Sequence, residues 1–246
     1  GNLWKWEFAD YNKSYIVVAD VARGDSSDFS TAHVIDVVAS NQVAEYKGKL
    51  DTKDFGNFLV ALATEYNQAL LVIENANIGW AAIQQVIDRN YGNLYYTEKD
   101  IKYVDAGNQF SNKYRSQDRN QVAGFSTTSR TRPLIISKLE EYIRDKSITI
   151  RSVRTIDEMF TFIWNNGRAE AMRGYNDDLV MALAIGLWVR DTALRLRQEG
   201  VDLTKQAINS ISSHTYTGIY GGNESDDNPW KMDIGDGTHE DLTNWL

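Results

Sequence analysis

The chain has 246 residues, no cysteine and a formal net charge of −8 at pH 7. The lack of cysteine excludes disulfides and thiolate zinc sites, and three scattered histidines argue against a histidine-rich metal site, so oxygen ligands remain. The sequence contains neither a long apolar run of roughly 18 residues nor a charged-then-apolar leader. We therefore expect a soluble intracellular protein that does not contact a membrane.

Charge is unevenly distributed along the chain. Residues 1–98 carry 7 Lys/Arg and 13 Asp/Glu, residues 99–173 carry 14 and 9, and residues 174–246 carry 5 and 12. The middle segment is therefore basic within an acidic protein. A local basic face can bind a phosphate backbone whatever the total charge, although a solvated surface would produce the same count.

The first half of the chain predicts alternating strands and helices. Short apolar runs separated by turn residues favour three antiparallel strands at 15–20, 31–38 and 43–49. Apolar residues at helical spacing then predict a helix after Asp51 or Thr52, either of which can be its N-cap. The elements expected here are a helix over 51–67, a strand over 69–73, a helix over 79–90 and a strand near 94–97.

The second half is more polar at its start and at its end. We expect a basic loop region over about 98–132, a helix over 133–146, a hairpin over about 160–172 with an Asn-Gly turn, and a helix over 177–198 with Asn176 as its N-cap. Residues 1–202 are expected to form one domain, and residues 203–246 an acidic polar tail that is peripheral or mobile. The predicted fold class is α/β, with a central mixed sheet of five or more strands, antiparallel first three strands and helices on both faces.

Acidic residues end two of the predicted buried strands and begin the last predicted helix. Asp20 ends the first strand, and Glu74 ends the strand that follows a crossover helix, so parallel pairing of these strands would bring both acids to one edge of the sheet. Asp177 and Asp178 open an apolar helix. Each acid alone has an ordinary interpretation as a strand-end or helix-start residue. Together they predict a site for divalent metal ions, because a lone carboxylate at a buried strand end needs a compensating charge.

Two divalent ions held by carboxylates can hydrolyse a phosphodiester by activating water and neutralising charge on the reacting oxygens. In such a site Asp20 is the natural bridging ligand, Glu74 would hold one ion, and Asp177 or Asp178 would complete it. The sequence does not say which member of the pair is the principal ligand.

Four segments together resemble one known family. They are Val18-Ala-Asp20, Gly24 with Asp28-Phe-Ser30, Val72-Ile-Glu74-Asn-Ala-Asn, and Gly174-Tyr-Asn-Asp-Asp-Leu-Val-Met-Ala-Leu-Ala-Ile-Gly-Leu-Trp188. This combination is similar to the nuclease domain of the large terminase subunit of tailed bacteriophages, closest to the T-even type, over roughly residues 1–200. The last segment is the most specific.

The resemblance implies an RNase H-like fold and a Mg²⁺- or Mn²⁺-dependent endonuclease with two ions in the active complex. It places the catalytic and metal-binding acids at Asp20, Glu74 and the Asp177-Asp178 pair. The implied activity is cleavage of double-stranded viral DNA concatemers during genome packaging, with little sequence specificity. The implied setting is the host cytoplasm, transiently at the viral prohead and not in the mature virion.

The implied partners are double-stranded DNA and, in the full-length protein, an ATPase motor domain, a portal and a small terminase subunit. The sequence departs from the family in two respects. The Gly-x4-Gly-Lys-Ser/Thr loop of an ATPase motor is missing, so we expect a separate nuclease piece, and Asn176 and Met181 stand where many members have a histidine and a further acid.

Basic residues around the loop and hairpin are the predicted DNA contacts. They are Lys102, Lys113, Arg115, Arg119, Arg130, Arg132, Arg168 and Arg173. Two other functions remain open at this stage. One is a Holliday-junction resolvase or transposase-like nuclease of the same fold, which would prefer branched DNA. The other is a non-catalytic module that binds DNA or docks a motor, for which EDTA would change nothing.

Overall fold

The structure is a computed structural model that describes residues 1–22, 29–76, 78–98, 121–165, 167–192, 194, 231–233 and 239–241. The chain divides into two units, residues 1–198 and residues 199–246. In the second unit the described residues form an antiparallel pair, β10 (Lys231–Asp233) with β11 (His239–Asp241). Within the described residues, no helix combines the length and apolar character needed to span a bilayer.

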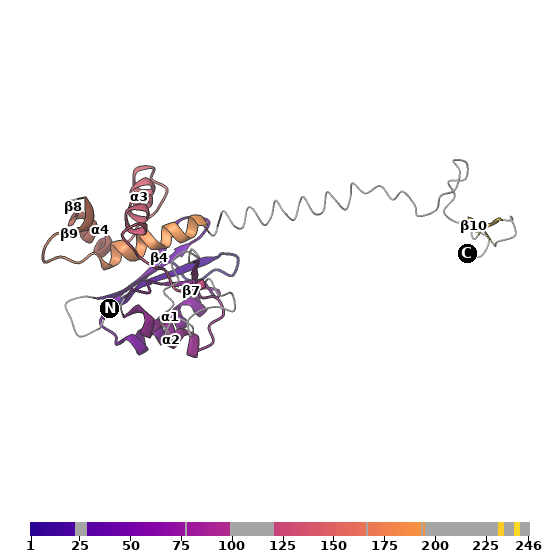
Figure 1. The fold of residues 1–246 in the computed structure, drawn as a ribbon, viewed down its shortest axis with the longest axis horizontal. Coiled ribbons are helices and arrows are strands. Elements are labelled where there is room, and N and C mark those ends of the chain that lie inside the picture. Colours follow the sequence, from indigo (N-terminus) through magenta and orange to yellow (C-terminus); the bar gives the residue numbers. More distant parts are fainter. Residues whose placement is uncertain are drawn as a thin grey trace, which may run out of the picture. The chain divides into compact units, whose positions relative to one another are not determined.

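The first unit is built on a five-stranded mixed sheet with the order β1-β4-β3-β2-β5. Figure 1 shows this sheet, in which β4 is labelled, between two layers of helices. Its strands are β1 (Leu3–Lys5), β2 (Tyr15–Asp20), β3 (Ser30–Asp36), β4 (Asn41–Gly48) and β5 (Leu70–Ile73). The pairs β2–β3, β3–β4 and β1–β4 are antiparallel, whereas β2 and β5 are parallel. The expected meander and the parallel pairing that follows the crossover helix are both confirmed.

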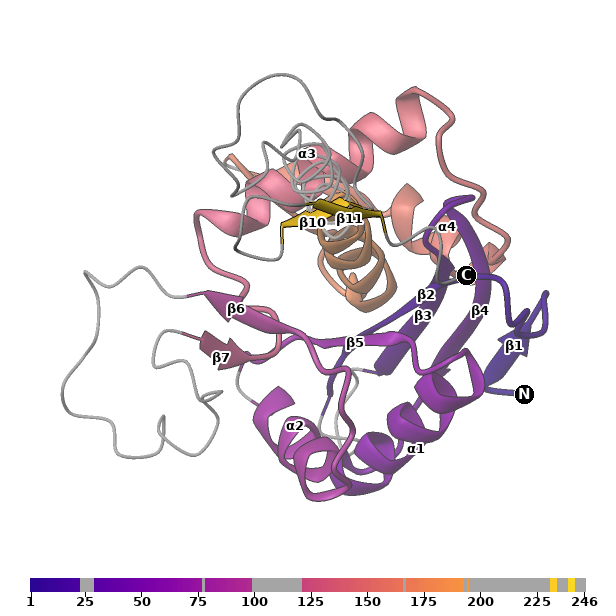
Figure 2. The same ribbon diagram turned by 90° about the vertical axis from the view of Figure 1, so that its right-hand side faces the viewer.

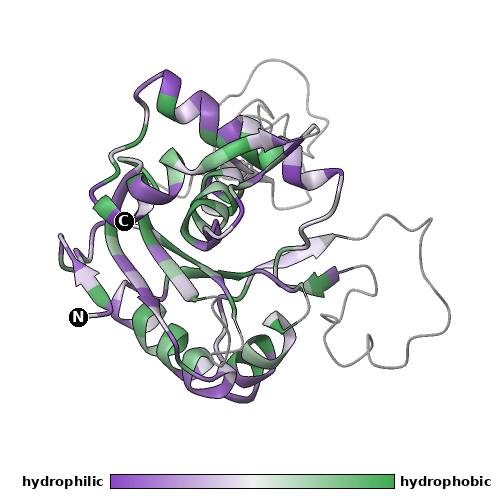
Figure 3. Ribbon diagram, turned by 90° about the vertical axis from the view of Figure 1, so that its left-hand side faces the viewer, coloured by the Kyte–Doolittle hydropathy of each residue, from purple (hydrophilic) through white to green (hydrophobic). Residues whose placement is uncertain are grey.

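Helices cover both faces of this sheet, as the sequence predicts (Figure 2). They are α1 (Thr52–Glu65), α2 (Gly79–Asp88), α3 (Thr131–Arg144), α4 (Val153–Phe160) and a helix over residues 178–192. Successive residues of β2 point to opposite faces: Val17 and Ala19 pack in the core with α1 and α2, whereas Ile16 and Val18 pack with α3 and the 178–192 helix. Figure 3 shows hydrophobic residues concentrated in the sheet and in the helix sides that face it.

The 178–192 helix lies unusually close to the sheet at Gly186. A Cβ atom there would come within 2.7 Å of Val18 Cγ1 and 2.8 Å of Ile35 Cδ1. Glycine therefore lets a helix that is buried on nearly every side in its first three turns pack directly onto β2 and β3. This packing fixes the beginning of the helix, where Asp178 lies, relative to the ends of the strands.

Two short antiparallel pairs flank the main sheet. One is β6 (Tyr96–Glu98) with β7 (Gln121–Ala123), and the other is the predicted hairpin, β8 (Phe162–Asn165) with β9 (Arg168–Ala171). The structure differs from the sequence expectations at β1, β7 and α4, which were not predicted, and at Phe160, which ends α4 instead of starting the hairpin. These are three-residue strands and a two-turn helix, too short to show a clear periodicity.

Element ends also shift where side chains form turns. The predicted strand 31–38 ends at Asp36, because the Asp36 carboxylate accepts hydrogen bonds from the Val38 and Ala39 backbone N–H groups and turns the chain. The predicted N-cap of the last helix is wrong. The helix begins at 178, and the backbone carbonyl of Asp177 accepts the first helical hydrogen bond from Met181, so Asp177 and not Asn176 occupies the N-cap position.

The predicted cap of α1 is confirmed for Asp51. Its carboxylate accepts hydrogen bonds from the backbone N–H groups of Lys53 and Asp54, both at 2.9 Å. We expect Asp51→Ala to lower the free energy of unfolding by about 1 kcal/mol, because two amides at the helix start lose their acceptor. Urea unfolding followed by circular dichroism measures this loss. Lys53→Ala, which removes no capping atom, should stay within about 0.5 kcal/mol of the wild type, and equal losses in both variants would contradict the assignment.

Candidate functional site

Asp20 and Glu74 lie side by side because their strands are parallel neighbours. Ala19 pairs with Ile73 in the register of β2 and β5, and the backbone N–H of Glu74 donates to the carbonyl of Ala19 at 3.0 Å. Asp20 follows Ala19 and Glu74 follows Ile73, so both carboxyl groups lie at the same carboxyl edge of the sheet.

The backbone around Glu74 is closely packed. A Cβ atom on Gly79, the first residue of α2, would lie 1.8 Å from the carbonyl oxygen of Glu74. On the other side, Asn75 N–H donates to Phe125 and Phe125 N–H donates to Ile73, at 2.9 and 2.8 Å. Glu74 therefore has little backbone freedom, since α2 starts directly against it and a neighbouring segment pairs with it.

Asp177 and Asp178 approach the same edge from the helix start but have different partners. The carboxylate of Asp177 forms an ion pair with Arg132 at 2.5 Å. The carboxylate of Asp178 accepts hydrogen bonds from the Phe29 backbone N–H at 3.1 Å and from the Asn176 side chain at 3.3 Å. The two acids of the pair are thus held differently, which the sequence could not indicate.

The negative charges of the other three acids act on Asp20. Burial raises the pKa of Asp20 well above its usual range, and the negative charges of Glu74, Asp178 and Asp177 raise it further. The site therefore concentrates negative charge that bound cations would neutralise.

A cleft of about 1250 Å³ opens over three of these acids, and Asp177 is not part of its lining. Asp20, Glu74 and Asp178 lie on one part of its lining, and Arg132, Trp164 and Arg168 lie on another. The second group comes from the start of α3 and from the β8–β9 hairpin. The cleft thus combines a carboxylate cluster with guanidinium groups, an arrangement suited to a phosphodiester that must be held and hydrolysed.

The donor set fits a hard divalent cation, because every acid offers carboxylate oxygens. The ligands match such a cation in chemistry and charge, but their positions do not form a complete coordination site. Among the residues that the structure describes, no three histidine, aspartate or glutamate side chains are grouped closely enough to form a ready-made metal site.

The predicted DNA contacts divide into three groups. Lys102, Lys113, Arg115 and Arg119 lie outside the described residues. Arg130 and Arg173 are exposed but are not part of the cleft lining, whereas Arg132 and Arg168 line it. Arg132 also donates to the carbonyl of Ala169 at 3.1 Å, which joins α3 to the hairpin.

Sequence reasoning missed other residues around the cleft. Phe29 lines it, and the ammonium groups of Lys47 and Lys49 lie 5.0 and 5.1 Å from the centre of the Phe29 ring. Trp164 lines the cleft with 59% of its surface exposed. The alternation of Lys47 and Lys49 at the end of the predicted strand 43–49 could have indicated that both side chains point to the same side, but the contact with Phe29 required the folded chain.

Comparison with known proteins identifies the fold. No family model matches the sequence. Among solved structures, the chain is similar to the large terminase nuclease of thermophilic phage G20c with bound magnesium, at 16% identity and a TM-score of 0.57, covering 76% of this chain and 87% of that one. It is also similar to the large terminase nuclease domain of Thermus phage P74-26, at 21% identity and a TM-score of 0.55, covering 76% and 84%. The G20c nuclease with bound zinc matches at 17% identity, with a TM-score of 0.53 and coverage of 76% and 86%.

These similarities confirm the predicted fold class. The mixed sheet with its antiparallel first strands and its helices on both faces is the RNase H-like arrangement of large terminase nuclease domains. The magnesium and zinc ions belong to the G20c structures.

Proposed function

We propose that this protein is a metal-dependent endodeoxyribonuclease that cuts double-stranded viral DNA during genome packaging. The observation that carries the proposal is the placement of Asp20, Glu74 and Asp178 in a cleft that Arg132 and Arg168 also line. A carboxylate cluster beside guanidinium groups suits a phosphodiester substrate, and the fold is that of phage nuclease domains.

Asp20, Glu74, Asp178 and Asp177 would hold Mg²⁺ or Mn²⁺, with Asp20 as the ligand shared between two ions. When bound, such ions supply an activated water and neutralise charge on the phosphate. The parallel pairing of β2 and β5 would keep Asp20 and Glu74 together, and Arg132 and Arg168 would direct the DNA backbone toward the acids. Arg132 has a double role in this proposal, since it contacts Asp177 and can also contact phosphate.

The proposed substrate is concatemeric DNA cut with little sequence preference, because Arg132 and Arg168 line the cleft together with the acids, where their guanidinium groups would contact the backbone phosphates that flank the scissile bond. In the complete machine this unit would act with an ATPase motor domain, a portal and a small terminase subunit at the prohead, in the host cytoplasm.

Nicking of supercoiled plasmid by the purified chain tests the proposal. We expect conversion to nicked and linear forms with Mg²⁺ or Mn²⁺ and none with EDTA, and cleavage of linear duplex about as fast as of branched DNA. Cleavage that persists in EDTA would contradict metal dependence. A strong preference for four-way junctions would instead favour a resolvase.

Arg168 gives a test of the DNA-binding part. It lines the cleft, its side chain is 68% exposed, and among the described residues it forms a long ion pair with Glu170 at 3.7 Å. We expect Arg168→Ala to weaken duplex binding and to reduce the slope of log affinity against log salt by about 0.9, the effect of losing one phosphate contact. Fluorescence anisotropy at several salt concentrations measures it.

The matched control for this prediction is Arg144→Ala. Arg144 is 65% exposed on α3, is paired with Glu140 and Asp145, and is not among the residues of the cleft. Arg144→Ala removes one positive charge, as Arg168→Ala does, but should leave the slope of log affinity against log salt unchanged. Equal effects of the two substitutions would show that binding responds to net charge and not to the cleft.

A further inference from the structure

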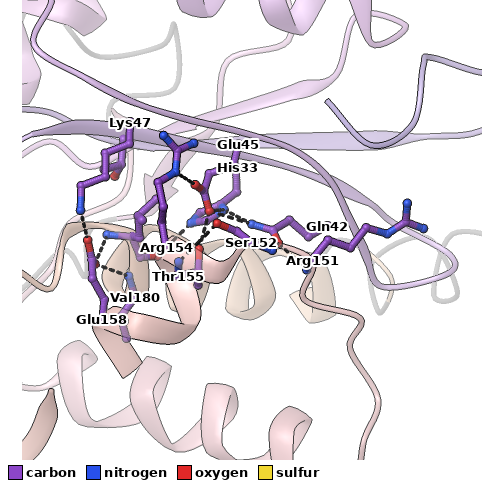
Figure 4. Close-up of polar contacts among 12 residues, drawn as sticks. His33, Gln42, Glu45, Lys47, Arg151, Ser152, Arg154, Thr155, Glu158 and Val180 are labelled. Carbon is purple, nitrogen blue, oxygen red and sulfur yellow. Dashed lines mark hydrogen bonds and ion pairs between the residues drawn. The ribbon is translucent and has the colours of Figure 1, made fainter. Parts of the chain in front are cut away.

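The helix that carries Asp178 is capped at its N-terminus by a side chain from outside the helix. The first amides of a helix have no partner within the helix, and a side chain at the N-cap position commonly accepts their hydrogen bonds. Asp177 occupies that position here, but its carboxylate is paired with Arg132. The amides are instead satisfied by Glu158 of α4, which accepts from Leu179 N–H at 2.8 Å and from Val180 N–H at 3.4 Å (Figure 4).

Glu158 is itself fixed in place. Its exposed fraction is 7%, and its other carboxylate oxygen accepts from the Lys47 ammonium group at 2.5 Å. Lys47 belongs to β4, so the carboxylate connects the central sheet, α4 and the helix start. A neighbouring set of buried contacts anchors α4 to β4, in which the Glu45 carboxylate accepts from Arg154 and Thr155 (Figure 4).

The backbone carbonyl groups of the same helical turn also accept hydrogen bonds from side chains outside the helix. The Thr31 hydroxyl donates to the carbonyl of Asp178 at 3.1 Å, and His33 Nε2 donates to the carbonyl of Leu179 at 2.9 Å. Both residues belong to β3, next to the strand that ends in Asp20. The first turn is therefore fixed to the sheet by its carbonyls and to α4 by its amides.

We propose that Glu158 is a positioning residue for the acidic cluster: it caps the 178–192 helix from a distant part of the chain, and this leaves the Asp177 carboxylate available to the site. Its effect on catalysis rests on the proposed nuclease function. Without Glu158, the nearest replacement acceptor is the Asp177 carboxylate, because an N-cap aspartate reaches the amides two and three positions further on, which here are Leu179 and Val180. Capping by Asp177 would draw this carboxylate away from Arg132 and the cluster.

The experiment compares Glu158→Ala and Glu158→Gln in the complete chain. Mn²⁺ binding without DNA is measured by electron paramagnetic resonance, and amide exchange of Leu179 and Val180 is measured by NMR without metal. We expect Glu158→Ala to bind Mn²⁺ about 10-fold more weakly, a loss typical of residues that orient metal ligands, and to exchange both amides faster. Glu158→Gln keeps an oxygen acceptor and should restore most of the affinity.

Asp36→Asn is the matched control. Like Glu158, Asp36 is buried, pairs with a lysine (Lys13, 3.0 Å) and accepts from two backbone amides, those of Val38 and Ala39. It lies at the end of the β2–β3 pair opposite Asp20, so its substitution should cost stability and leave Mn²⁺ affinity and the Leu179 and Val180 amides unchanged. Should Glu158→Ala fail to fold, Glu158→Leu combined with Lys47→Met replaces the buried pair by apolar side chains and is expected to show the same two effects.

Mn²⁺ affinity and amide exchange equal to those of the wild type in the folded Glu158 variants would overturn the inference. The amide measurement separates this failure from a failure of the proposed function. If the wild type neither binds Mn²⁺ nor cuts DNA, the nuclease proposal fails, while faster exchange in Glu158→Ala alone would still support the capping role and unchanged exchange would refute it.

Discussion

Replacing Asp20 by asparagine is expected to abolish metal-dependent plasmid cleavage, lowering the rate by at least about 10³-fold. The reason is that the carboxylate at the end of β2, the proposed shared ligand, would be lost while its shape is kept, and several kcal/mol of transition-state stabilisation would depend on ions bound there. A nicking assay with Mg²⁺ or Mn²⁺ measures the rate. Undiminished nicking would refute the assignment of Asp20.

The same variant should be more stable than the wild type without metal near neutral pH. Burial and the charges of Glu74, Asp178 and Asp177 raise the pKa of Asp20 in the folded state. As the pH rises above the ordinary aspartate value, the unfolded chain releases this proton first, so the wild type loses stability across that window. Asp20→Asn has no proton to lose there, and its advantage should shrink at acidic pH.

Asp36→Asn is the matched control, since Asp36 also ends a strand, at the opposite end of the β2–β3 pair. Burial alone would raise the pKa of Asp36, but the Ala39 N–H and the Lys13 ammonium group outweigh it and lower that pKa. Removing this charge should therefore destabilise the fold by about 1–2 kcal/mol and leave cleavage intact. Thermal unfolding that changes in the same direction for both variants would contradict the electrostatic argument.

Gly79→Ala is expected to be among the most damaging single-methyl additions, costing about 3 kcal/mol of unfolding free energy and most of the cleavage activity. The added Cβ would stand 1.8 Å from the carbonyl oxygen of Glu74, and backbone cannot move aside as a flexible side chain can. Either α2 or Glu74 must shift, and a shift of Glu74 separates it from Asp20. Urea unfolding and the nicking assay measure both effects.

Gly92→Ala provides the comparison, because no heavy atom lies within 4 Å of the position its Cβ would take. Its stability should remain within about 0.5 kcal/mol of the wild type, with normal cleavage. A Gly79→Ala variant as active and stable as Gly92→Ala would mean that the close approach of α2 to Glu74 is not a constraint on the site.

The sequence alone was sufficient where a signal repeats along the chain. The apolar run before Asp20 and the helical periodicity before Glu74 predicted a strand, a crossover helix and a parallel strand, and hence two acids at one edge of the sheet. The cap at Asp51 and the hairpin turn after Asn165 were also predictable, since caps and tight turns depend on residues within a few positions.

Only the tertiary structure decided which charged and hydrogen-bonding groups pair with one another across long separations in the sequence. Glu158 is 21 residues from Leu179 and 111 from Lys47, and Arg132 is 45 residues from Asp177, distances over which no local pattern operates. These partners are chosen by how α3 and α4 pack against the sheet. The sequence determined that the acids Asp20 and Glu74 would meet, because strand pairing follows from periodicity; folding determined how Asp177 and Asp178 differ, because their environments are made by side chains from other elements.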